Sequence, residues 1–127
     1  MDFNISKGIK GEMEIKVEYK DTAANVGSGL VEVFATPSMI ALMENTAQSS
    51  VAKDLPEGFA TVGIDVNIKH IKATPIGMKV KCFSELEEIK GKKLYFKLEA
   101  YDEKGKIGEG SHTRYIIDVE KFMENTK

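Results

Sequence analysis

One apolar helix followed by four closely spaced strands constrains the fold of this chain more than any other sequence feature. Residues 35–53 predict the helix, because Thr36 suits an N-cap and Pro37 suits the first helical position. The helix is expected to continue to about Lys53, and its first two turns are apolar on almost every side. This pattern predicts a buried helix, which ends at the turn formed by residues 55–58.

The rest of the chain alternates between apolar and polar residues, with turn residues between the segments. In residues 61–73 the alternation places Val62, Ile64, Val66, Ile68 and His70 on one face of the strand. Residues 21–29 are small and polar and predict a loop, and Asp118 is expected to cap a short final helix. Strands are predicted at residues 12–19, 61–73, 78–89, 94–100 and 107–117.

Short turns make sequential strands antiparallel neighbours, so the strands should form one antiparallel sheet. Such a sheet must cover one of its faces, and the apolar helix is the only element available to do so. We therefore predict an α+β fold in which a curved five-stranded sheet wraps around one long central helix. Because one helix cannot cover five strands fully, we expect a second copy of the chain to complete the cover.

Length and composition exclude several classes of protein. A chain of 127 residues is one domain, and its single cysteine, Cys82, excludes an internal disulfide. One cysteine and two histidines cannot form a Cys/His zinc site, and no metal is expected. There is no apolar run long enough for a membrane span and no signal peptide at the start. With a pI near 5.7, we expect a soluble cytoplasmic protein without a nucleic-acid or membrane partner.

Glu44 is the first candidate for chemistry. At helical spacing it shares a face with Ile40, Ala47 and Val51, and a carboxylate on an apolar face is costly unless it is paired. A carboxylate in such a place can serve as a general base. The alternative is that this edge of the helix faces water, beside other polar residues of the helix.

Three further residues have both a structural and a functional interpretation. His70, near a strand end, is either a half-exposed strand residue or an acid-base group. Thr36 is either only an N-cap or a hydroxyl placed at the positive end of the helix dipole. Gly63, inside a β-branched strand, marks either a plain bulge or the close approach of a ligand or of backbone, with its N–H available to an oxyanion. Arg114 is the only arginine of the chain, and His112 is expected to be structural.

Several segments together resemble the fluoroacetyl-CoA thioesterase-like branch of the hotdog-fold thioesterases. The similarity covers nearly the whole chain in order and at matching spacing. The matching segments are residues 33–44 (VFATPSMIALME), 62–64 (VGI), 70–78 (HIKATPIGM), 108–114 (GEGSHTR) and 119–122 (VEKF).

The resemblance implies a hotdog fold that works as a homodimer, possibly in a higher assembly, and an enzyme that hydrolyses a short-chain acyl-CoA thioester. It implies a catalytic set of Thr36, Glu44 and His70 and an oxyanion-binding Gly63, with no cofactor other than the CoA of the substrate. Residues 21–29 do not reproduce the aromatic features that select fluoroacetyl groups in the family, so the acyl group stays open. The alternatives are a non-catalytic acyl-CoA-binding protein and a hydratase or dehydratase on the same scaffold.

Overall fold

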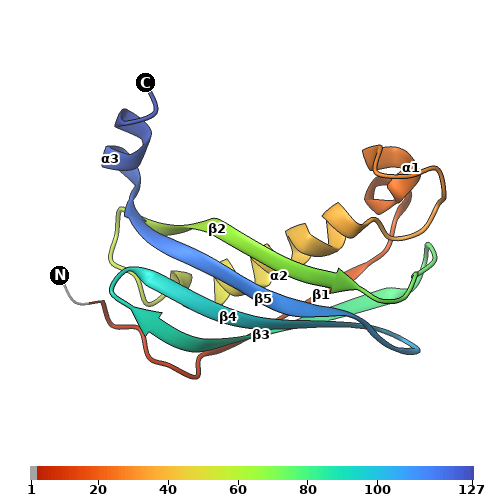
Figure 1. Cartoon of the computed structure of the whole chain (residues 1–127), viewed down its shortest axis with the longest axis horizontal. Helices are drawn as coiled ribbons and strands as arrows, with labels where there is room; N and C mark the ends of the chain where they lie inside the picture. Colours follow the sequence, from red (N-terminus) through yellow and green to blue (C-terminus); the bar gives the residue numbers. More distant parts are fainter. Residues whose placement is uncertain (1–2) are drawn as a thin grey trace.

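The computed structural model describes residues 3–127, and its main elements are one long helix and one five-stranded sheet (Figure 1). The helices are α1 (Ala23–Val26), α2 (Thr36–Ala52) and α3 (Val119–Glu124), with a 3₁₀ turn, η1, at Tyr19–Asp21. The strands are β1 (Lys10–Lys16), β2 (Phe59–His70), β3 (Lys79–Lys90), β4 (Lys93–Asp102) and β5 (Gly105–Asp118).

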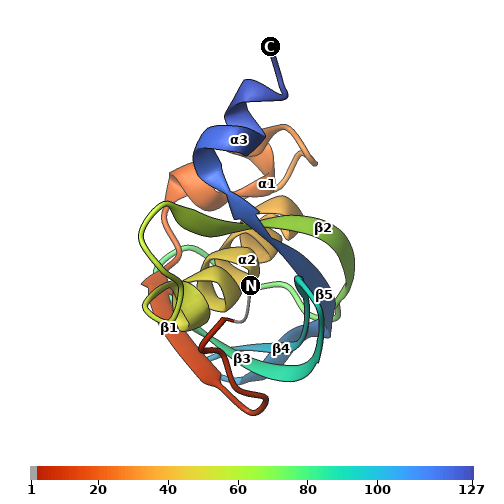
Figure 2. The same ribbon diagram turned by 90° about the vertical axis from the view of Figure 1, so that its left-hand side faces the viewer.

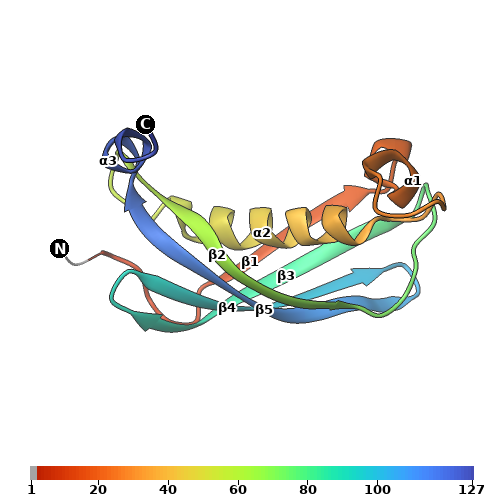
Figure 3. The same ribbon diagram turned by 45° about the horizontal axis from the view of Figure 1, so that its top comes forward.

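The strands follow the order β1-β3-β4-β5-β2, and every neighbouring pair is antiparallel. The sheet curls around α2, as the end-on view in Figure 2 shows, and α2 lies along its concave side in Figure 3. The predicted curved five-stranded sheet around one helix is therefore confirmed, but one predicted neighbour pair is wrong: β2 does not pair with β3 and lies instead at the sheet edge beside β5. The connection at residues 71–78 crosses to the other half of the sheet and does not form a hairpin turn. The core between helix and sheet is continuous, and its largest fully buried side chains include Phe34, Met39, Met43, Leu86, Leu94, Phe96, Leu98 and Ile107.

The start of α2 differs from the prediction. Ala35 occupies the N-cap, without a side-chain hydrogen bond to the helix, and Thr36 is the first helical residue. The N-cap interpretation of Thr36 is therefore wrong. Because Thr36 is not the N-cap, its hydroxyl is free to bond outside the helix.

A bulge in β2 overturns the predicted single face of that strand. Gly63 lies opposite Arg114 and Asp65 lies opposite Thr113, so Ile64 is the extra residue. Residues directly opposite in an antiparallel pair point to the same face. The side of the sheet that faces the helix therefore carries residues 61 and 63 before the bulge and residues 66, 68 and 70 after it. Strict alternation could not place an odd-numbered Gly63 and an even-numbered His70 on the same side.

The segment before α2 is also more structured than expected. Residues 21–29, predicted as a loop, contain α1, and Thr22 accepts a hydrogen bond of 3.3 Å from the Asn25 N–H at its start. At the other end of the chain, Asp118 caps α3 as predicted, accepting from the Lys121 N–H at 3.2 Å. Across residues 3–127, none of the helices has both the length and the apolar character that spanning a membrane requires.

Candidate active site

The first pair of predicted site residues meets at the start of α2. Thr36 Oγ1 and His70 Nδ1 share a hydrogen bond of 2.8 Å, whose donor depends on the imidazole tautomer. His70 reaches Thr36 because it ends β2 on the helix-facing side, and the Phe34 ring packs edge-on against its ring with centroids 6.5 Å apart. The structure thus joins a hydroxyl to an imidazole beside the positive end of the helix dipole.

The surroundings of His70 favour its neutral form. Burial lowers the pKa of His70 below its ordinary value, and the nearby Lys72 backbone acts more weakly in the opposite direction. Its Nε2 atom is buried and has no hydrogen-bond partner within residues 3–127. A neutral imidazole can take a proton at neutral pH.

A cavity of about 390 Å³ borders this pair. Its walls are mostly small or aliphatic, and its one charged lining residue, Lys72, has its ammonium group 3.3 Å from Asp102. The lining residues are Ala23, Ser28, Gly29, Val31, Val33, Phe34, Ala35, Thr36, His70, Ile71, Lys72 and Ala73. Such walls suit a neutral, apolar group of modest size.

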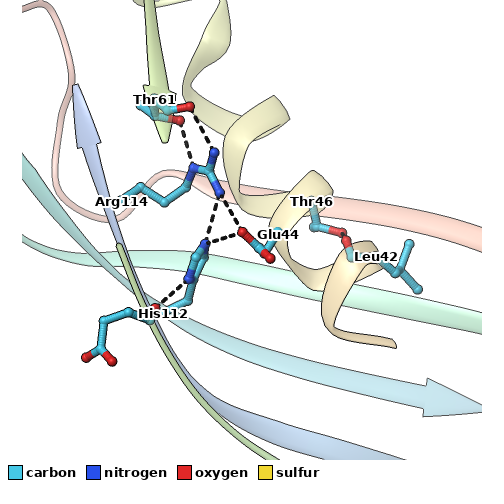
Figure 4. A network of polar contacts seen from close by, with 7 residues as sticks. Leu42, Glu44, Thr46, Thr61, His112 and Arg114 are labelled. Atoms are coloured by element: carbon cyan, nitrogen blue, oxygen red, sulfur yellow. Dashed lines mark hydrogen bonds and ion pairs between the residues drawn. The ribbon is translucent and has the colours of Figure 1, made fainter. Parts of the chain in front are cut away.

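Glu44 lies in a second polar cluster, which Figure 4 shows between α2, β2 and β5. Its Oε2 is 3.4 Å from Arg114 Nη1 and 3.8 Å from His112 Nε2, and its side chain is 39% exposed. Arg114 is buried and also donates to the Thr61 hydroxyl at 2.7 Å and to the Thr61 carbonyl at 2.9 Å. The carboxylate is therefore paired, half-buried and open to solvent on one side.

His112 belongs to the same cluster, although the sequence indicated only a structural residue. One ring nitrogen, Nδ1, lies 2.7 Å from the carbonyl oxygen of Asp65 in the β2 bulge, and the other, Nε2, lies 3.0 Å from Arg114 Nη1. Burial is the main cause that lowers its pKa, and the guanidinium of Arg114 adds to the effect. His112 thus joins the bulge to the arginine that holds Glu44.

Gly63 faces this cluster directly. A Cβ atom at this position would lie 2.5 Å from Glu44 Oε2 and 3.0 Å from His112 Cε1. The predicted bulge is therefore present, and the group that approaches Gly63 closely is the Glu44 side chain. The approach of a ligand to Gly63 stays a prediction. The bulge turns Gly63 towards the helix, and the missing side chain leaves room for the Glu44 carboxylate.

The structure brings the four predicted residues together as two pairs. Thr36 contacts His70, and Glu44 lies against Gly63. Thr36 and Glu44 are eight residues apart in one helix, which corresponds to about 12 Å along its axis. A single chain therefore does not bring Thr36, Glu44 and His70 to one point.

Thr61 was missed by the sequence analysis, and Arg114 was noted there without a role. The only signal for Arg114 was its being the sole arginine of the chain, and Thr61 gave no signal at all. Cys82, by contrast, is buried in the core, and burial raises the pKa of its thiol to about 11. It is not ionised near neutral pH and has no place in the site.

Comparison with known proteins gives consistent similarities. The family model described as fluoroacetyl-CoA-specific thioesterase matches residues 17–120. A fluoroacetyl-CoA thioesterase of Streptantibioticus cattleyicolor is 37% identical over 91 residues, which cover 72% of this chain and 66% of that relative, slightly under two thirds of its length.

Solved structures extend the similarity to the fold. A variant of the fluoroacetyl-CoA-specific thioesterase, in complex with fluoroacetate and CoA, superposes with a TM-score of 0.88 at 30% identity, over 93% of this chain and 99% of that chain. A hot-dog-like protein from Thermanaerovibrio acidaminovorans superposes with a TM-score of 0.89 at 24% identity, over 99% and 95% of the two chains. The sheet and helix described above thus form a hotdog fold.

Proposed function

Because this chain belongs to the fluoroacetyl-CoA-specific thioesterase family, we propose that it hydrolyses an acyl-CoA thioester to a carboxylic acid and CoA. The observation that carries the proposal is the 2.8 Å contact between Thr36 and His70 beside a mostly apolar cavity. A hydroxyl–imidazole pair next to a cavity of this kind is suited to acyl transfer to water. The complex of a family member with fluoroacetate and CoA supports CoA as the carrier.

The chemistry we propose uses groups of this chain alone. The Gly63 N–H would polarise the thioester carbonyl, and Glu44 would activate the attacking water or attack the carbonyl itself. Thr36 would help to hold the reacting oxygen, and the proton that Glu44 takes from water would pass through His70 to the sulfur of the departing thiolate. If Glu44 attacks the carbonyl itself, water would then hydrolyse the acyl-Glu44 anhydride to release the acid. No resident cofactor or metal is part of this proposal.

The site is completed, in our proposal, by a second subunit. Thr36 and His70 of one subunit would meet Glu44 and Gly63 of the other, because the two pairs are too far apart within one chain. A twofold axis beside the middle of β2 would run the two α2 helices antiparallel, which brings the start of one helix towards the middle of the other. The half-exposed carboxylate of Glu44 would then become covered.

The free edge of β2 supports this homodimer. In the described part of the chain β2 pairs only with β5, and it carries Ile64 and Val66 with exposed fractions of 50% and 40%. The opposite edge, β1, exposes charged residues at Lys10, Glu12, Glu14 and Lys16 instead, and such charges discourage edge pairing. Any assembly beyond a dimer, and a location in the cytoplasm, stay predictions from the sequence.

Replacing Ile64 by aspartate is expected to yield a monomer with little thioesterase activity, because the charge would fall on the proposed β2–β2 contact. Sedimentation velocity and a thiol-release assay on the same sample would check this. Phe83→Asp is the control, since Phe83 is a 37% exposed apolar residue of β3, away from that edge. A dimeric, fully active Ile64→Asp protein would contradict the β2 contact.

A thiol-release assay over a panel of acyl-CoAs tests the activity itself. We expect short, neutral acyl groups such as acetyl, propionyl and butyryl to react faster than malonyl or succinyl. Among residues 3–127, no free cation lines the cavity to pair with a second carboxylate. Fluoroacetyl-CoA belongs in the same panel. Tight binding of acyl-CoAs in a thermal shift, without any release of thiol, would instead indicate a non-catalytic binding protein.

Both histidines are expected to titrate below their ordinary pKa of about 6.5, because burial disfavours the imidazolium of His70 and of His112. The unfolded chain then takes up protons more readily than the folded one as the pH falls through 6.5. The free energy of unfolding should therefore decrease towards acid pH over this interval. Histidine NMR titration, with His70→Asn to assign the signals, would check this, and a His70 midpoint at or above 6.5 would contradict it.

A further inference from the structure

A buried carboxylate at the end of β4 lies outside the proposed catalytic set. The side chain of Asp102 is 0% exposed, and four hydrogen bonds reach it. Thr74 Oγ1 donates to it at 2.9 Å and the Lys104 N–H at 2.8 Å, while Lys72 Nζ lies 3.3 and 3.4 Å from its two oxygens. Burial acts to raise the pKa of Asp102, but the hydrogen bonds from Lys104, Thr74 and Lys72 outweigh it and keep the pKa below its ordinary value.

The segment that Asp102 holds connects β2 to β3, directly after His70. Thr74 is the fully buried residue of this segment, with an exposed fraction of 0%. Its carbonyl accepts a hydrogen bond of 2.8 Å from the Phe34 N–H. Thr74 is thus hydrogen-bonded through its side chain to Asp102 at the end of β4. Through its backbone carbonyl it is hydrogen-bonded to Phe34, two residues before α2.

Both members of the Thr36–His70 pair depend on this connection. Phe34 lies two residues before Thr36, and its ring packs against the ring of His70. His70 itself lies four residues before Thr74, in the same segment. A shift of Thr74 would therefore move the start of α2, the Phe34 ring and the end of β2 relative to one another.

We propose that Thr74 and Asp102 are positioning residues, which fix the Thr36–His70 hydrogen bond through Phe34 and the segment after His70. The proposal rests on the proposed function only in treating that pair as catalytic. The geometry of the pair can be measured without any substrate. A hydrogen bond to a buried carboxylate holds its partners firmly, and a displacement of about 1 Å at reacting groups lowers rates on the order of 100-fold.

Two variants of Thr74 separate positioning from general stability. Thr74→Val removes the hydroxyl at almost constant volume, and Thr74→Ser keeps it. Glu103→Gln is the matched control, because Glu103 is the carboxylate next to Asp102. It accepts a hydrogen bond of 2.8 Å from the Lys79 N–H, where the segment after His70 joins β3. Asp102→Asn tests the other side of the contact.

The readouts are kcat, KM and the imidazole NMR signals of the two histidines, with His112 as the internal reference. We expect Thr74→Val and Asp102→Asn to lower kcat about tenfold or more, to leave KM within about twofold, and to shift the signals and pKa of His70 but not of His112. Thr74→Ser and Glu103→Gln should match the wild type in all of these.

Three results would overturn the proposal. One is a folded Thr74→Val protein whose His70 signals are those of the wild type. Another is an equal loss in Thr74→Val and Thr74→Ser. The third is a common shift of both histidines, which would indicate a general loosening of the fold. Should the chain hydrolyse no acyl-CoA at all, the His70 signals still decide whether Thr74 and Asp102 position the pair, so the two proposals fail separately.

Discussion

Replacing Glu44 by glutamine is expected to lower kcat/KM for acyl-CoA hydrolysis by about 10²–10⁴-fold, the range that a positioned general base contributes. Glutamine keeps the shape of the side chain and can still accept from Arg114, but it can neither take a proton nor attack the thioester. Stability should change by less than about 1 kcal/mol, because the carboxylate is 39% exposed and its pairing with Arg114 is partly screened. Thiol release and thermal unfolding, measured on the same sample, would check both parts.

The control for this prediction is Glu57→Gln, which removes a carboxylate at an exposed position after α2. It should have the activity of the wild type. Equal rates for wild type and Glu44→Gln would end the assignment of Glu44 to the chemistry. A large fall in unfolding temperature would show instead that the carboxylate is structural.

Replacing Gly63 by alanine is expected to lower kcat/KM by about 10²-fold or more. The new methyl group would lie 2.5 Å from the present position of Glu44 Oε2, so the carboxylate must move, and a misplaced reacting group costs rate on that order. The cost in stability should be about 1–3 kcal/mol, as for other additions to a packed site, since the ring of His112 is also within 3.0 Å of the new atom.

A double-mutant cycle shows whether this loss passes through Glu44. In the Glu44→Gln background there is no catalytic carboxylate to displace, so Gly63→Ala should cause little further loss of kcat/KM. Additive losses would contradict this prediction and would point instead to a displaced Gly63 N–H, the proposed donor to the thioester carbonyl. The measurement is thiol release by the two single variants, the double variant and the wild type.

The sequence was sufficient for the architecture because its signals are local. The apolar helix after Pro37, the alternating strands and the cap at Asp118 all appear in the structure with boundaries shifted by a few residues. Gly63 was also readable, since a glycine in a β-branched strand has few structural explanations. These features depend on neighbours in the chain, which a sequence displays directly.

The remaining features depend on contacts between distant segments. Gly63 indicated a possible bulge, but the sequence did not show how the bulge changes which residues of β2 face the helix. Thr36 was assigned to a cap because the sequence does not show that His70 lies 2.8 Å away. Asp102 falls between the predicted strands at 94–100 and 107–117 and gave no signal of burial, although the structure buries it against Thr74 from another segment.

Mixed dimers test most directly whether one site is built from two subunits. Glu44→Gln and His70→Asn are each expected to be inactive as homodimers. After equal amounts are mixed and subunits exchange, half of the dimers would contain one copy of each variant. In each mixed dimer, one of the two sites would be intact, with Thr36 and His70 from the Glu44→Gln subunit and Glu44 from the His70→Asn subunit. About one quarter of the wild-type activity should therefore return. If subunits exchange and no activity returns, Glu44 and His70 do not act across the interface, and the account is contradicted.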